Sequence, residues 1–180
     1  MNRCSWVNLN NPLYIKYHDY EWGRASHDDN YLLEMLILES FQAGLSWECV
    51  LNKREDFRLA YDNFDLNKII SYGEEKIIEL MNNTKIIRNK RKIIASINNA
   101  KIFKNIQEEF GSFNNYIWSF TKNKTINRKS SEIINKNTLS DKISIDLQKR
   151  GMKFVGSVII YSYLQAIGII NDHEQNCEFK

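Results

Sequence analysis

The first 23 residues, MNRCSWVNLNNPLYIKYHDYEWG (1–23), combine an unusual density of aromatic rings with a cysteine and a histidine. The rings belong to Trp6, Tyr14, Tyr17, Tyr20 and Trp22, in a stretch with little helical or strand periodicity. A terminus with this many large apolar side chains needs something to hold it, because termini are otherwise poorly ordered. The segment therefore predicts a partner elsewhere in the chain.

The last residues offer that partner. His173 and Cys177 are four positions apart, so on one helical turn both would face the same point. Together with Cys4 and His18 they make a Cys2His2 set, the ligand set of a closed tetrahedral zinc site. The plainer alternative is a stray thiol, a surface histidine and a coincidence of spacing. Spacing alone leaves that alternative open, because the chain has no CxxC pair and no HExxH.

Three blocks of sequence resemble one known family. They are CSWVNLNNPLYIKYHDYEWG, LESFQAGLSWECVLNKRE and KRGMKFVGSVIIYSYLQAIGIINDHEQNC, in that order along the chain. They are similar to the DNA-3-methyladenine glycosylase I family of bacterial, zinc-containing base-excision enzymes, over nearly the whole chain. The resemblance implies a helix–hairpin–helix glycosylase fold that hydrolyses the N-glycosidic bond of 3-methyladenine in alkylated DNA without cutting the strand. It also implies one structural zinc on the four ligands, with segments 1–23 and 168–180 packed on the helical body.

Composition sets wider bounds. A chain of 180 residues that is 43% hydrophobic suits a single compact domain over residues 1–180, which we expect to be a monomer. No apolar run approaches the ~20 residues of a membrane span, and the N-terminus lacks a signal-peptide core, so we predict a cytoplasmic protein. An odd number of cysteines without framework spacing is not a disulfide scaffold. The net charge of +3 permits nucleic acid without identifying a partner.

Helical periodicity predicts an all-α fold. Helices are expected at about 30–43, 47–61, 73–83, 88–110, 113–120, 141–150 and 156–168, with a short turn after Asp65 and a polar surface loop over 121–137. Asp28 or Asp29, Ser46, Ser112 and Ser140 are the expected N-caps. The β-branched run SVIIY could also be a strand, but its flanking glycines favour helix.

Glu39 is the most informative residue of the central helix, because the face around it is otherwise apolar. A carboxylate there is costly unless it is paired, so it is either a satisfied core residue or a functional one. The Gly44 turn in QAGLSW would bring Trp47 back toward the same cavity. A ring to stack on and a carboxylate acceptor are what an extruded purine requires.

The resemblance assigns these residues to the base pocket. It places Glu39, Trp47 and Tyr17 around the base, with Glu39 as base reader and electrostatic partner of its positive charge, and it leaves open whether Glu39 also activates water. Trp6, Tyr14 and Trp22 supply further aromatic surface, although each could equally be core packing.

A basic run lies at the junction of two predicted helices. It comprises Lys85, Arg88, Lys90, Arg91 and Lys92. Hairpin amides and flanking cations grip a DNA phosphate in helix–hairpin–helix proteins, so we predict contact with double-stranded DNA here, against the plainer alternative of a solvated turn.

The chain departs from the family pattern in two places. Lys85 replaces a glycine that lets a hairpin approach phosphate closely, and Ser40–Phe41 replaces a glycine–glutamine pair beside Glu39. The second change could narrow the pocket and shift which alkylated base is tolerated.

Two other functions remain open from the sequence. One is a non-catalytic, zinc-stapled helical module that binds damaged DNA. The other is a small-molecule purine site, against which salt-sensitive duplex binding would count.

Overall fold

The computed structural model describes residues 1–128 and 132–180. Its α-helices are α1 Pro12–Tyr20, α2 Asp29–Gln42, α3 Trp47–Leu51, α4 Arg54–Ala60, α5 Leu66–Ile70, α6 Glu74–Asn82, α7 Lys90–Phe110, α8 Phe113–Ser119, α9 Thr138–Lys149 and α10 Ser157–Ala166. A 3-10 turn, η1 Asp62–Phe64, joins α4 to α5. Two strands, β1 Ile126–Asn127 and β2 Ile170–Asn171, pair in parallel. The all-α prediction is therefore confirmed, with one short strand pair added. None of the described helices is both long and apolar enough to cross a membrane.

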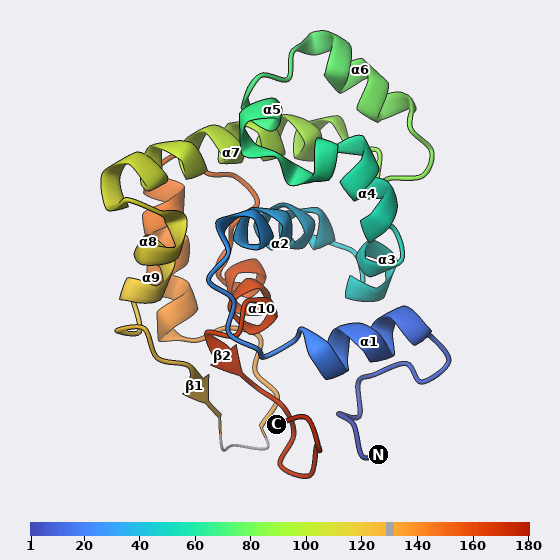
Figure 1. Ribbon diagram of the computed structural model, residues 1–180, viewed down its shortest axis with the longest axis vertical. Coiled ribbons are helices and arrows are strands. Elements are labelled where there is room, and N and C mark those ends of the chain that lie inside the picture. The colour runs from blue at the N-terminus through green and yellow to red at the C-terminus, as the bar shows by residue number, and fades with distance from the viewer. Residues whose placement is uncertain (129–131) are drawn as a thin grey trace.

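Helix α2 lies at the centre of the molecule (Figure 1). It packs against α10 and α7, and also contacts α3 and α8. Every residue from Leu32 to Phe41 is buried, as expected for a helix that is apolar nearly all round. Asp28 caps it, because its Oδ1 accepts the amide of Asn30 at 3.1 Å. This helix fixes the position of Glu39 in the interior.

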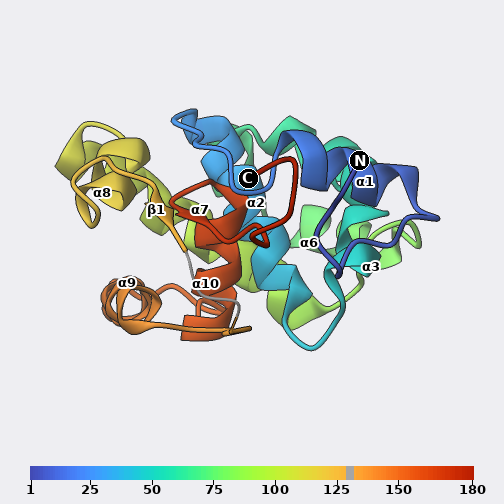
Figure 2. The ribbon, with the colours of Figure 1, turned by 90° about the horizontal axis from the view of Figure 1, so that it is seen from below.

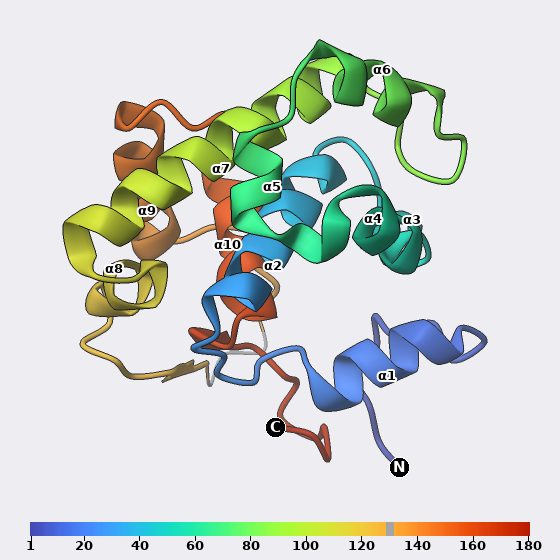
Figure 3. The same ribbon diagram turned by 45° about the horizontal axis from the view of Figure 1, so that its top comes forward.

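The helices that follow α2 form the layer above it. α5 and α6 pack on the long helix α7, and the loop 83–89 connects α6 to α7 on the side of α3 and α4 (Figure 3). Asn89 begins α7, where its Oδ1 accepts the amide of Lys92 at 3.1 Å. Two helices and a short connection are thus present where helical periodicity predicts them.

The C-terminal half closes the other side of the core. α9 packs on α10 and lies far from α6 (Figure 2). The chain leaves α10 at Gly168, whose φ of +75° and closeness to a neighbouring backbone both require glycine. A Cβ there would lie 2.1 Å from the carbonyl carbon of Arg24. β2 then runs beside β1, with the amide of Ile126 donating to the Ile169 carbonyl at 2.8 Å.

The two ends of the chain meet (Figures 1 and 3). The amide of Glu178 donates to the carbonyl of Asn2 at 3.0 Å, and the amide of Asn2 donates to Glu178 Oε1 at 3.1 Å. The contact that the aromatic N-terminal segment predicts is therefore present.

Several local predictions were wrong. The N-terminal segment contains a helix, α1, whose signal was Asn11–Pro12: Asn11 Oδ1 accepts the amides of Leu13 and Tyr14, and proline suits the first helical position. The predicted helix 47–61 is broken by a turn at Asn52–Lys53.

The predicted start of α9 was also wrong. Its cap is Asn137, whose Oδ1 accepts the amide of Ser140, while the Ser140 hydroxyl accepts the amide of Asn137. The predicted loop 121–137 contains β1, which is too short to give an alternating pattern, and its residues 129–131 lie outside the described ranges.

Candidate active site and metal cluster

Glu39 is a buried carboxylate, one oxygen of which has no partner in the part of the chain that the structure describes. It is 2% exposed, and its Oε2 has no hydrogen bond within the described chain. Burial raises the pKa of this carboxyl well above its ordinary value of 4.5, because a buried site disfavours the charged form. Buried polar groups almost always have partners, and an exception beside a cavity marks a candidate functional site.

The turn after α2 brings an aromatic ring to this carboxylate. Gly44 has a φ of +78°, and Ser46 then caps α3 by accepting the amide of Cys49 at 3.2 Å. The ring of Trp47, the first residue of α3, lies 5.2 Å from that of Tyr17 on α1, tilted by 47°. Burial raises the pKa of the Tyr17 phenol, and the nearby Glu39 charge adds to the rise. The predicted trio of Glu39, Trp47 and Tyr17 is therefore assembled from three helices.

These side chains line one cavity of ≈ 700 Å³. Trp6, Tyr14 and Trp22 also line it, as does a rim from α10 and the C-terminal segment that includes Gln165 and Asp172. None of its described lining residues is a lysine or an arginine. The cavity has the size and the mixed aromatic and polar lining of a small-molecule or base pocket.

Two further groups in this cavity lack partners. Gln42 Oε1 and Trp47 Nε1 are both buried without a hydrogen bond in the described structure. Gln42 was not among the predicted site residues, although it follows Glu39 by three residues and so shares its helix face. Beside the Glu39 carboxyl, Gln42 therefore offers an unpaired acceptor and Trp47 an unpaired donor, which suits a planar ligand with both kinds of group.

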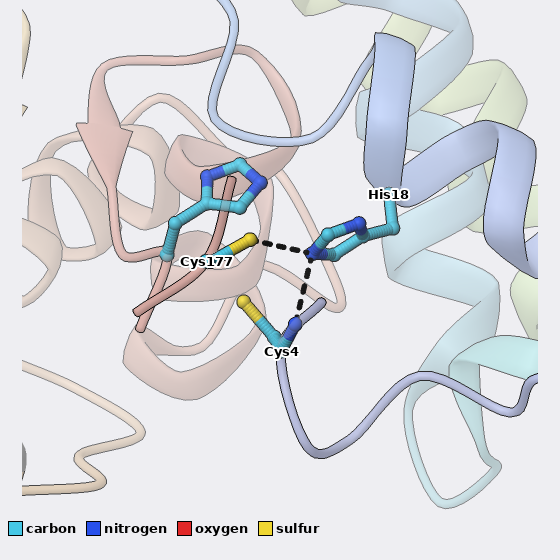
Figure 4. Close-up of side chains that lie close together, drawn as sticks. Cys4, His18 and Cys177 are labelled. Carbon is cyan, nitrogen blue, oxygen red and sulfur yellow. Dashed lines mark hydrogen bonds between the residues drawn. The ribbon is translucent and has the colours of Figure 1, made fainter. Parts of the chain in front are cut away.

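The four predicted metal ligands converge. The ligand atoms of Cys4, His18, His173 and Cys177 all lie within 4.8 Å of one another, and all four residues are buried. Cys177 Sγ is 3.5 Å from His18 Nε2 (Figure 4). Ligand atoms of a tetrahedral zinc site lie about 3.3–3.8 Å apart, given its bond lengths of about 2.0–2.3 Å. The donor set suits a metal ion, and the Cys177–His18 pair already has the separation of a tetrahedral site.

Neighbouring groups orient both imidazoles. His18 Nδ1 lies 2.8 Å from Asp19 Oδ1, and His173 Nδ1 lies 2.8 Å from Asn171 Oδ1, so each ring turns its Nε2 inward. The Nε2 of His173 is buried without a partner. Asp19 in turn forms an ion pair with Arg3, whose Nη2 lies 2.7 Å from Asp19 Oδ2. Partners of this kind fix the tautomer of a metal-bound histidine.

Burial also shapes the protonation of these ligands. It lowers the pKa of His173 to about 4 and, in the protein alone, raises the pKa of the Cys4 thiol to about 12. A neutral imidazole is ready to bind a metal, whereas the thiolate needs a cation to offset its burial.

The spacing of His173 and Cys177 predicts that they share one helical turn, and this prediction was wrong. They lie in the C-terminal segment after β2, where the amide of Cys177 donates to the carbonyl of Glu174 at 3.0 Å. This turn brings the two side chains together without a helix.

The aromatic rings join the metal cluster to the cavity. The ring centroid of Trp22 lies 4.7 Å from those of both Trp6 and His173, and the ring centroids of Trp6 and His18 are 5.3 Å apart. Gly23, with a φ of +72°, passes so close that a Cβ would lie 3.0 Å from the His173 ring. One wall of the cavity is therefore built directly on His18 and His173, two of the four candidate metal ligands.

The basic run occupies the hairpin and the first turn of α7. Lys85, Arg88, Lys90 and Arg91 are exposed, and neither Arg88 nor Arg91 has an ion pair in the described chain. Lys85 does not have positive φ, so the hairpin forms without the glycine typical of the family. Lys92 differs: it is buried, and its ammonium donates to the carbonyls of Phe41 and Ala43.

Known proteins match this chain along its whole length. A model of the methyladenine glycosylase family matches residues 6–180. DNA-3-methyladenine glycosylase 1 of Escherichia coli (strain K12) is 43% identical, covering 98% of this chain and 96% of the relative. The DNA-3-methyladenine glycosylase of Haemophilus influenzae is 37% identical, covering 99% and 97%.

Solved structures agree. A crystal structure of 3-methyladenine DNA glycosylase I is 42% identical, covers 98% of each chain and has a TM-score of 0.94. The Staphylococcus aureus enzyme, whose structure concerns its recognition of 3-methyladenine, is 32% identical, covers 100% and 97%, and has a TM-score of 0.95.

Proposed function

The chain belongs to the methyladenine glycosylase family, and on this premise we propose that it removes 3-methyladenine from alkylated DNA at the cavity beside Glu39. The observation that carries the proposal is the buried, unpaired carboxylate of Glu39 next to the rings of Tyr17 and Trp47. The reaction is the first step of base-excision repair, and its product is an abasic site.

The chemistry follows from the charge of the base. Methylation at N3 makes the adenine cationic, so the glycosidic bond is already weakened and the leaving base needs no strong acid. The nucleotide is extruded, the base stacks on Trp47, and Glu39 accepts a hydrogen bond from the exocyclic amine. Burial raises the pKa of Glu39 in the free protein, and the positive ring of the bound base opposes that rise by favouring the ionised form.

Water completes the reaction. As the bond between C1′ and N9 breaks, its electron pair stays on N9, which neutralises the base. An oxocarbenium-like sugar develops, water oxygen attacks C1′, and the water loses a proton to solvent or to Glu39. Stacking and the carboxylate favour this transition state by holding the base as it leaves.

We propose that the enzyme is a simple hydrolase that leaves the strand intact. Strand cleavage by glycosylases uses an amine that attacks C1′, and none of the described cavity-lining residues is a lysine. The ammonium of Lys92, which reaches the end of α2, donates to two backbone carbonyls instead.

The exposed cations of the hairpin are proposed to grip double-stranded DNA. Lys85, Arg88, Lys90 and Arg91 lie on or next to a connection between helices, where cations and amides position a phosphate. Lys92 is left out of this set because its charge is buried.

The metal is proposed to be one structural zinc. Four protein ligands leave no position for water or substrate, so the ion would act by fastening residues 1–23 to 168–180 and by holding Trp6 and Trp22 in the cavity wall. A single continuous hydrophobic cluster includes residues of both segments, which supports one domain. We further propose that it acts as a monomer in the cytoplasm, where the DNA it repairs is found.

One assay tests the proposal against its rivals. Purified protein is incubated with alkylated duplex DNA, and the released bases and strand breaks are separated and counted. Free 3-methyladenine with intact strands is the expected result. Tight, salt-sensitive duplex binding without release would instead identify a damage-binding module, and purine binding without duplex affinity would identify a small-molecule site.

A further inference from the structure

The structure turns one cation of the basic run inward. Lys92 lies in the first turn of α7 and is 8% exposed. Its Nζ donates to the carbonyl oxygens of Phe41, at 2.8 Å, and Ala43, at 2.6 Å. An ammonium held in this way is not free to contact a phosphate, so Lys92 has a role other than gripping DNA.

Both acceptors belong to the end of α2. The last carbonyls of a helix have no partner within it, and a cation placed there satisfies them and complements the helix dipole. α2 ends at Gln42, and Gly44 has open space around its Cα. Within the turn, the amide of Leu45 donates to the carbonyl of Gln42 at 2.7 Å, and Lys92 adds a tie from a different helix.

That direction decides the geometry of the base pocket. The stretch from Phe41 to Ser46 separates the carboxylate of Glu39 from the ring of Trp47. A shift of the loop by about 1 Å would change how a base stacks while the carboxylate holds it, and misplacements of this size cost enzymes much of their rate.

A second contact ties the same region to the hairpin. Lys53, just beyond α3, donates from its Nζ to the carbonyl of Lys85 at 3.1 Å. The segment 41–53, which carries Trp47, is therefore fastened near both ends to the segment 85–92. Burial lowers the pKa of Lys92, a cost that the two carbonyls offset.

We propose that Lys92 is a positioning residue that fixes the loop between Glu39 and Trp47 to the start of the DNA-gripping helix. The segment that would bind phosphate, 85–92, is then directly bonded to the segment that positions the base, 41–53. The inference rests on the proposed function, because it assigns Lys92 a part in that same reaction.

Three variants test it. Lys92→Met keeps the apolar stem and removes the ammonium, and Lys92→Arg keeps the charge with a different reach. Lys101→Met, the matched control, removes a charge from an exposed position of the same helix. The readouts are amide hydrogen exchange at residues 43–47 in the free protein, affinity for free 3-methyladenine by tryptophan fluorescence, single-turnover base release at saturating protein, and duplex affinity.

Lys92→Met should speed exchange at residues 43–47. It should also weaken base affinity and slow release by about tenfold or more, as the loss of a charge-assisted hydrogen bond predicts. Duplex affinity should stay within about twofold of wild type. Lys92→Arg should recover part of both losses, and Lys101→Met should match wild type.

Two results would overturn the inference: wild-type exchange and base affinity in folded Lys92→Met, or a loss confined to duplex affinity, which would make Lys92 a phosphate contact. If Lys92→Met does not fold, the same measurements are made on Lys92→Arg. Wild-type exchange and base affinity in that variant, or a loss confined to duplex affinity, would then overturn the inference. The exchange readout involves no DNA. A wild-type protein that releases no 3-methyladenine would therefore refute the proposed function while leaving the positioning result readable.

Discussion

At the scale of single residues, Glu39 combines two properties that stability alone would not select. Its side chain is buried on the central helix, and one of its oxygens has no partner in the described structure. By contrast Glu34, one turn earlier on α2, is also buried but pairs with Arg54 at 2.6 Å and with Arg58 at 2.9 Å. The chain therefore satisfies one buried carboxylate of α2 and leaves the other for a ligand.

Glu39→Gln should slow single-turnover release of 3-methyladenine steeply. The glutamine removes the negative partner of the cationic ring and can set its own amide donor against the exocyclic amine. A mismatch of this kind costs on the order of 2–4 kcal/mol, or roughly 30- to 900-fold in rate.

Affinity for a duplex with an abasic site is the internal control, because it does not require the base pocket. It should stay close to wild type. Release of 3-methyladenine at the wild-type rate by Glu39→Gln would show that Glu39 is a core residue with no part in the reaction.

The same substitution should stabilise the protein, and increasingly so at higher pH. The folded-state pKa of Glu39 is raised, so above about pH 4.3 the unfolded chain ionises this group while the folded chain retains the proton. The folded state then binds more protons, and stability falls as pH rises toward the folded pKa. Glutamine does not titrate and escapes this loss.

Thermal melts of wild type and Glu39→Gln from pH 4.5 to 8 would measure the effect. The difference in melting temperature should grow with pH, by about 2–4 °C for each kcal/mol gained. A difference that is constant or shrinks with rising pH would show that Glu39 is already ionised in the folded protein.

At the scale of elements, the connection between α6 and α7 divides its cations between two tasks. Arg88 and Arg91 are exposed and free of ion pairs in the described chain, whereas Lys92 caps the end of α2. Adjacent basic residues of one run thus face different surroundings, because successive positions on a helix point about 100° apart.

Removing Arg88 and Arg91 together should weaken duplex binding about equally for all sequences. Each lost phosphate contact should lower the slope of log affinity against log salt by about 0.9. Fluorescence titrations between 50 and 300 mM salt would measure that slope. The Lys101→Ala/Lys104→Ala double variant removes the same charge farther along α7 and should keep the wild-type slope. Equal slopes in both double variants would place the DNA contact elsewhere.

The end of α10 is the element most sensitive to a single methyl group. Gly168→Ala would place a Cβ 2.1 Å from Arg24 backbone, so it should cost several kcal/mol or prevent folding. Gly44→Ala is matched in positive φ but meets no atom within 4 Å, so only about 1 kcal/mol of backbone strain is expected. Urea unfolding of both variants measures the difference. Equal losses would mean that φ alone, and not the contact, requires glycine at position 168.

At the scale of the whole molecule, the metal cluster closes the chain on itself. Cys4 and His18 come from one end and His173 and Cys177 from the other, and the rings of Trp6 and Trp22 pack between the cluster and the cavity. Stability and the shape of the pocket should therefore depend on the same ion.

Elemental analysis should find one zinc per chain, and Cys4→Ser should lower its occupancy. Loss of even about 3 kcal/mol from a structural site would lower the melting temperature by roughly 6–12 °C for a chain of this size. Cys49→Ser is the matched control, because this half-buried third cysteine lies outside the cluster. An unchanged melting temperature in Cys4→Ser, or a metal-free wild type, would refute the structural role.

The sequence by itself determined the helical class and the buried character of α2, because periodicity is a local property that the chain shows directly. It offered Cys4, His18, His173 and Cys177 as a ligand set, but spacing left their convergence open until the structure showed it. It also identified Glu39, since a carboxylate on an apolar helix face is conspicuous without coordinates. Only the tertiary structure showed that Glu39 lacks a partner, that Gln42 shares its cavity and that Lys92 faces inward. A side chain's hydrogen-bond partners come from segments distant in sequence, and no periodicity records which of those segments folding brings together.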